Sequence, residues 1–262
     1  MVYKYAALFR RSVGIMLEYR VSMLIWMLTA SFPLVMMAVW LTLAQDGPVG
    51  NYAPGDFVAY YLLALYVRMM TAVWVAWELD HDIRHGELAI KLLHPLNPIH
   101  DYVSFNLADK VLRFLLITPL ILLAARLVPD VHLALTPVNV ILFFVALAFA
   151  WLLRYITDYT VGLLSFWLSQ VTTLQEIIWM LLLLLGGTVA PIDLLPGWLA
   201  AIAKYLPFRF MLSFPVEIML GRLSAYDLLT GLLVSLAWLA LFQALHVLVW
   251  RRGIRAFSAY GA

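Results

Sequence analysis

The chain has no cysteine and little charge. Of its 262 residues, only 12% are charged and 65% are hydrophobic, and its mean hydropathy is +0.94. The absence of cysteine excludes a disulfide framework, a cysteine metal site and a thiol nucleophile. The shortage of charge excludes an ordinary soluble domain, in which about a quarter of the residues are charged. We therefore expect an all-α membrane protein that crosses the bilayer several times.

Two further absences narrow the function. No Gly-Lys dipeptide occurs, so the phosphate-binding loop GxxxxGK[ST] is missing, and any ATP-driven work must draw its energy from another polypeptide. The net charge is only +2, and the basic residues are spread among loops, so no nucleic-acid partner is expected. The N-terminus is not expected to be a cleavable signal: Arg10, Arg11 and Arg20 precede the first apolar run, and no small-residue cleavage site follows that run closely.

Six apolar runs are candidates for membrane-spanning helices, each of which needs about 20 residues. They cover residues 21–44, 57–77, 111–128, 138–168, 175–190 and 227–250. Arg154 and Asp158 interrupt the fourth run, so it is either one long helix or two short crossings.

The distribution of basic residues favours one long helix. Lys and Arg gather on the cytoplasmic side of membrane proteins, and here they are concentrated near both ends and between the second and third runs. The loops 45–56 and 129–137 contain neither Lys nor Arg. Both termini are therefore expected in the cytoplasm, which requires an even number of crossings, and a single helix over 138–168 gives six.

Two segments outside these runs are also expected at the membrane. Residues 3–19 mix aromatic and aliphatic side chains with Arg10 and Arg11, as in a helix that lies in the interface. Residues 191–226 are apolar but broken by proline, and such backbone is tolerated at membrane depth only when packed in protein or lining a cavity. We expect an outward-facing re-entrant hairpin there, with Arg209 and Glu217 able to pair across it. Its breaks are assigned to Pro191, Pro196, Pro207 and Pro215.

A charged segment, residues 82–101, separates the second and third runs and cannot lie in hydrocarbon. Its middle, from Gly86 to Leu93, is predicted to form a short helix, because Pro95 and Pro98 cannot continue one. There is no internal repeat and no low-complexity tract, so residues 1–262 are expected to form a single permease domain.

The order of these parts resembles the membrane subunit of type-2 ATP-binding-cassette exporters, and most closely the branch grouped with daunorubicin and viologen exporters. The resemblance covers nearly the whole chain. It is carried by EYR at Glu18–Arg20, IRHGELAIKLLHPLNPI at 83–99, FW at Phe166–Trp167, LPFRFMLSFPVEIMLGRLS at 206–224 and the terminal RRGIRAFSAYGA. It implies that two permeases pair, either identical or paralogous, and that two ATPase subunits dock beneath them. Mg-ATP would then bind to the ATPase subunits, with no cofactor on this chain.

On this reading the helix at 86–93 couples the permease to its ATPase. Glu87 and Lys91, four residues apart, are expected to pair on one side, while Leu88, Ile90 and Leu92 offer apolar contacts. The alternative is a plain cytoplasmic helix without a partner. The residues expected to carry the coupling are Gly86, Glu87, Leu88, Lys91, Leu92 and Pro95.

Four ionisable residues fall inside the expected spans, where charge is costly and usually faces a cavity or a partner. Arg154 and Asp158 can pair on one helix face, and Arg68, which has no local partner, is expected to meet a carboxylate on another span. Glu176 opens the fifth span. These four residues either line a polar path and switch, or form satisfied structural contacts.

Aromatic and methionine side chains are candidates for an apolar wall along such a path. They are suited to a bulky apolar or cationic aromatic substrate. The candidates are Met69, Met70, Trp74, Trp77 and Phe166.

The histidines suggest a metal site only superficially. His81 and His85 have the i,i+4 spacing of zinc ligands, with His94 and His100 nearby. No third ligand is fixed by the spacing, and a solvated loop explains these residues more simply, so no metal is expected.

The function expected from residues and resemblance together is the transmembrane subunit of an ATP-driven exporter, itself not an enzyme, in the inner membrane and in contact with its lipids. An integral-membrane lipid-modifying enzyme and a stand-alone ion-coupled carrier remain as alternatives. The enzyme lacks a recognisable spacing of nucleophile and base, and the carrier has only Asp158 near the midplane and no repeat. The cargo, and the choice between homodimer and heterodimer, are left open.

Overall fold

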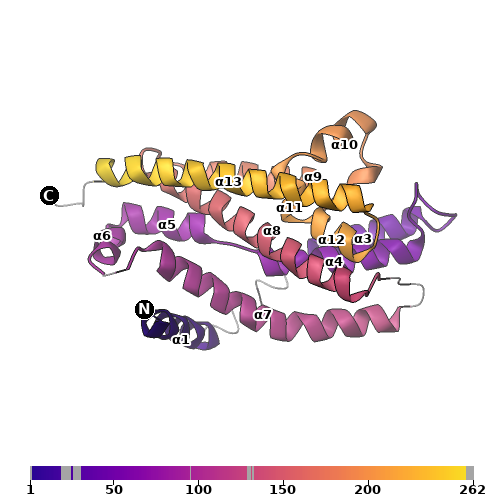
Figure 1. Ribbon diagram of the computed structural model, residues 1–262, viewed down its shortest axis with the longest axis horizontal. Helices are drawn as coiled ribbons and strands as arrows, with labels where there is room; N and C mark the ends of the chain where they lie inside the picture. The colour runs from indigo at the N-terminus through magenta and orange to yellow at the C-terminus, as the bar shows by residue number, and fades with distance from the viewer. Residues whose placement is uncertain are drawn as a thin grey trace.

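The computed structural model of the chain describes residues 2–18, 25, 31–94, 96–128, 131 and 133–257, and within these ranges every regular element is a helix. Figure 1 shows the long helices running roughly along one axis. The elements are α1 (Val2–Glu18), α3 (Phe32–Leu43), α4 (Pro54–Thr71), α5 (Val75–Arg84), α6 (Glu87–Leu92), α7 (Ile99–Leu127), α8 (Pro137–Leu163), η1 (Leu164–Phe166), α9 (Val171–Leu185), η2 (Ile192–Leu194), α10 (Gly197–Ala203), α11 (Pro207–Met211), α12 (Ser213–Met219) and α13 (Ala225–Ala256).

The two ends of the molecule differ in what they carry. The helices α1 and α6 and the C-terminal end of α13 lie at one end of the long axis, on the left of Figure 1. The short helix α10 and the connection between α7 and α8 lie toward the other end. Helix α13 packs along α8, and α1 packs along α7.

Three of the described stretches are long and apolar enough to cross a membrane: Pro54–Arg84, Pro137–Phe166 and Ala225–Ala256. The apolar helices α3 and α9 are shorter. Most of the predicted first span, 21–44, lies outside the described residues. The predicted third span, 111–128, is the second half of α7, which runs without interruption from the charged segment. The protein thus crosses the membrane several times, and the count of six remains a prediction.

The region 138–168 is one helix rather than two short crossings. Pro137 occupies the first turn of α8, and the Thr136 side chain accepts a hydrogen bond from the Asn139 backbone nitrogen at 3.2 Å, which caps the helix. Helix α8 then passes Arg154 and Asp158 unbroken and ends in the 3-10 turn η1.

The predicted second span, 57–77, lies within the apolar stretch Pro54–Arg84, but two helices form it instead of one. Helix α4 ends at Thr71, Ala72 is extended with φ −58° and ψ 132°, and α5 starts at Val75. The break contains no glycine or proline. It is stabilised instead from α7, where the Lys110 ammonium and the Asn106 side-chain amide both donate to the Ala72 carbonyl.

The proline-rich stretch after α9 forms the short helices that the sequence predicts. Helix α9 ends at Leu185, earlier than the predicted 190, and the chain turns at Gly187, whose φ of 92° suits glycine. Pro191 precedes η2 and Pro207 begins α11, as expected for breaks. Pro215 lies in the first turn of α12, where a missing N–H costs no helical hydrogen bond, and the break itself falls at Leu212 between α11 and α12.

Two apolar clusters form the core of the described chain. One joins α4 and α8 to α11 and α12. The other joins α5, α6 and α7 to the C-terminal part of α8 and includes Leu79, Leu88 and Tyr159. The clusters meet where α4 breaks and where Arg154 lies on α8.

Candidate functional site

Helix α6 has one buried face and one exposed face. Gly86, which precedes it, has φ 76° and lets the chain turn sharply after α5. Leu88 is fully buried, whereas Ile90 is 62% and Leu93 85% exposed. Leu88 was expected to offer a contact to a partner, but it anchors α6 in the core. Ile90 and Leu93 are the apolar side chains that this helix presents outward.

The ion pair predicted within α6 is replaced by one to α5. Lys91 Nζ lies 2.5 Å from Asp82 Oδ2, so it does not pair with Glu87, which is exposed. The Tyr102 hydroxyl of α7 donates to the same Asp82 carboxylate, and Lys91 Nζ lies 4.1 Å from the Tyr102 ring centroid. Burial, together with this hydrogen bond, raises the pKa of Tyr102, so the hydroxyl stays a donor. Asp82 therefore fastens α6 to both α5 and α7.

The remaining residues of the predicted coupling segment take no part in the contacts of Asp82 with Lys91 and Tyr102. Leu92 is half-buried and packs against the inner cluster. Pro95 lies outside the described residues. Pro98 is buried and immediately precedes α7.

The histidines near α6 are brought together only in part. The rings of His81 and His85 stack with centroids 4.1 Å apart. Ligand atoms of His81, Asp82 and Glu87 lie within 4.8 Å of one another, but Asp82 already binds Lys91 and Tyr102. The expectation that the chain holds no metal stays a prediction.

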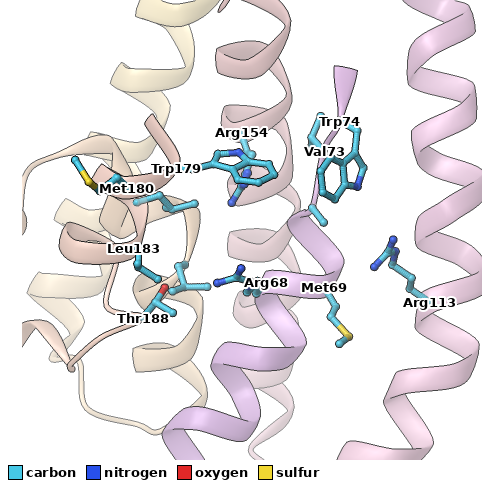
Figure 2. A pocket seen from close by; sticks show the side chains of 13 residues that line it. Arg68, Met69, Val73, Trp74, Arg113, Arg154, Trp179, Met180, Leu183 and Thr188 are labelled. Carbon is cyan, nitrogen blue, oxygen red and sulfur yellow. The ribbon is translucent and has the colours of Figure 1, made fainter. Parts of the chain in front are cut away.

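A second feature is a cavity of about 350 Å³ beside the break after α4 (Figure 2). Its polar lining includes Arg68 from α4, Arg113 from α7 and Arg154 from α8. The rest is mainly apolar: Met69, Ala72, Val73, Trp74, Trp179, Met180, Leu182, Leu183, Thr188 and Leu212.

The arginines of this cavity differ in their partners. Arg113 Nε lies 2.7 Å from Asp109 Oδ1 on the same helix. Within the described part of the chain, neither Arg68 nor Arg154 forms a hydrogen bond or an ion pair within 4.0 Å. The predicted Arg154–Asp158 pair is therefore not formed, and the carboxylate expected for Arg68 is absent among these residues. Two further cations line the cavity with Arg68: Arg113, which is paired with Asp109, and Arg154.

The two acidic path candidates do not line the cavity. Asp158 is buried on α8, and its Oδ2 atom has no hydrogen-bond partner. Glu176 is exposed on α9, while its neighbour Gln175 is fully buried. Of the predicted apolar wall, Met69 and Trp74 line the cavity, but Met70, Trp77 and Phe166 do not.

The predicted hairpin pair is confirmed. Arg209 Nη2 lies 2.6 Å from Glu217 Oε2, with side chains only 11% and 9% exposed. Arg209 also donates to the Lys204 carbonyl at 3.2 Å. The pair joins α11 to α12, which meet at the kinked residue Leu212.

Comparison with known proteins decides the family. A family model described as ABC-2 family transporter protein matches residues 24–261. This chain belongs to the ABC-2 transporter family. A comparison with curated proteins gave no match.

Family membership makes the chain an ABC-2 permease of the membrane, in agreement with its apolar helices. The narrower resemblance to daunorubicin and viologen exporters stays a prediction. Reasoning from the sequence alone missed Arg113, Trp179 and Thr188 as cavity residues of this ABC-2 permease, because nothing in their local sequence shows which helices meet.

Proposed function

We propose that this ABC-2 permease is the transmembrane subunit of an ATP-driven exporter, in which separate ATPase subunits act on α6. The observation that carries the proposal is that Ile90 and Leu93 are exposed at α6. The helix itself is held in place by the buried Leu88 and by the ion pair of Lys91 with Asp82. An exposed apolar patch on a rigid element is typical of a docking surface. The chain needs such a partner, because it has no phosphate-binding loop of its own.

The contacts of α6 provide a route for the force. Asp82 joins α6 to α5 and α7, and α5 packs on α8. Displacement of α6 by a closing ATPase would therefore move α5 against α4 at the break around Ala72. The arginine-lined cavity lies at that joint, where a change of angle alters its shape.

The remaining parts of the proposal follow from this arrangement. The end of the molecule that carries α1, α6 and the C-terminus would face the cytoplasm of an inner-membrane protein, with six crossings and the helices after α9 at the outer face (Figure 1). Two permeases, identical or paralogous, would enclose the path within membrane lipid. Mg-ATP would bind only to the ATPase subunits, and the cargo would leave the cell.

A photo-crosslinking amino acid in place of Ile90 tests the proposal in the native membrane. The expected adduct is a protein that contains the GxxxxGK[ST] loop, identified by mass spectrometry of the crosslinked band. The matched control is the same amino acid in place of Trp198, which is 70% exposed on α10 and should give no such adduct. Equal ATPase adducts from both positions, or none from Ile90, would refute docking at α6.

A further inference from the structure

The cavity beside α4 holds two arginines, Arg68 and Arg154, that form no ion pair within 4.0 Å in the described part of the chain. Arg154 is 8% exposed, and Figure 2 shows Arg68 and Arg154 directed into the same space. Two like charges in a medium of low dielectric constant repel each other and lose hydration. Such an arrangement is favourable only when an anion completes it.

The chain offers almost no carboxylate for this task. Fourteen of its fifteen acidic residues lie in the described ranges, the exception being Asp130. None of the fourteen lies within 4.0 Å of the Arg68 or Arg154 guanidinium group. Asp158, one turn from Arg154, is 1% exposed and does not line the cavity. Since no described carboxylate supplies the missing negative charge, the arrangement points to an anion from another molecule.

The walls indicate what kind of molecule this is. Trp74, Trp179, Met180 and Leu183 surround the guanidinium groups with apolar surface. Thr188, labelled in Figure 2, contributes a hydroxyl to the same wall. Guanidinium and hydroxyl donors suit phosphate or carboxylate oxygens, and the apolar walls suit a hydrocarbon or ring system.

We propose that this cavity binds the anionic head of an amphiphile, a phosphate or carboxylate attached to an apolar body, and that the cargo belongs to this class. The assignment as cargo rests on the proposed export function. It replaces the cationic aromatic substrate that the methionine and tryptophan residues suggested, because a cation would be repelled by Arg68 and Arg154.

The test is thermal unfolding of the purified chain in a neutral maltoside detergent. The probes are dodecyl phosphate, dodecyltrimethylammonium, inorganic phosphate and phosphatidylglycerol. We expect dodecyl phosphate at saturation to raise Tm by at least about 2 °C, and the cationic analogue and inorganic phosphate to leave it unchanged. If phosphatidylglycerol raises Tm more than dodecyl phosphate does, the ligand is a two-chain lipid. If phosphatidylglycerol leaves Tm unchanged, the ligand is a single-chain acid.

Substitution of the two arginines separates binding from a structural role. Arg68→Met and Arg154→Met should each abolish the shift given by dodecyl phosphate. Arg68→Met should also raise Tm without the probe, since a charge that has no counter-charge in the described chain is removed. The matched control is Arg126→Met, an exposed position on α7, which should keep the wild-type shift.

Three results would overturn the proposal: equal shifts from the cationic and anionic probes, a full shift that persists in both arginine variants, or a shift from inorganic phosphate as large as that from dodecyl phosphate. The experiment uses the chain without its ATPase. Failure here with success of the crosslink at Ile90 would therefore remove the anionic cargo and leave the export function standing. The opposite pair of results would leave an anion site on a protein of another function.

Discussion

At the residue scale, the buried charges of this permease fall into two kinds. Arg209 and Glu217 satisfy each other at 2.6 Å, whereas Arg68 and Arg154 share a cavity without a carboxylate. The first kind could be predicted from sequence, since two opposite charges eight residues apart lie in a stretch folded back by prolines. The second could not, because both arginines were expected to have acidic partners.

Removal of one member of the Arg209–Glu217 pair should destabilise the fold strongly. Breaking a buried pair leaves an uncompensated charge and typically costs about 3–5 kcal/mol. We expect Arg209→Ala to lower Tm markedly in detergent. The control is Lys204→Ala, because Lys204 and Asp193 form an exposed pair at 3.8 Å, and such pairs contribute only about 0–1 kcal/mol. Equal effects of the two substitutions would show that the buried pair has no special role in stability.

At the element scale, the sequence predicts that α6 exists but not which of its faces is buried. Pro95 and Pro98 predict a short helix after Gly86, and the helix is there. Which face it buries was mistaken, because Leu88, Ile90 and Leu92 look equivalent in sequence. The choice is made by α5 and α7, whose Asp82 and Tyr102 hold Lys91 and so turn Leu88 inward.

The turn before α6 depends on glycine. Gly86 has φ 76°, and a side chain there meets no atom within 4 Å, so a substitution is costly only through backbone strain. That strain amounts to roughly 1–2 kcal/mol for an L-residue other than Asn or Asp. Gly86→Ala should lower Tm accordingly, and Gly86→Asn should lower it less.

The control for this turn is Gly197→Ala at the start of α10, which also meets no atom within 4 Å but has no positive φ. It should leave Tm unchanged or slightly raised. If Gly86→Ala behaves like Gly197→Ala, then α6 does not require the left-handed turn.

At the scale of the whole molecule, composition predicted the class and proline positions predicted the short helices after α9. The break at Ala72 was invisible, since it has no glycine or proline and is held by Lys110 and Asn106 from another helix. The cavity lies beside that break. The sequence therefore could not predict that Arg68 and Arg154 line the same cavity.

The proposed orientation can be tested directly, because the chain has no cysteine. Asp46→Cys and Trp198→Cys, both at exposed positions, should react with a membrane-impermeant maleimide in intact cells. Glu87 is the exposed first residue of α6. Glu87→Cys should react with the maleimide only after the membrane is permeabilised. Labelling of Glu87→Cys in intact cells would invert the orientation.

The most direct test of the central claim is ATP hydrolysis by the permease purified with whatever binds it and reconstituted in nanodiscs. The wild-type preparation should hydrolyse ATP. The double variant Ile90→Asp with Leu93→Asp should purify in equal yield without this activity, since both positions are exposed and charges there disrupt only an apolar contact. ATP hydrolysis that survives in the double variant, or that is absent from the wild type, would contradict the account of α6 as the element that receives the force.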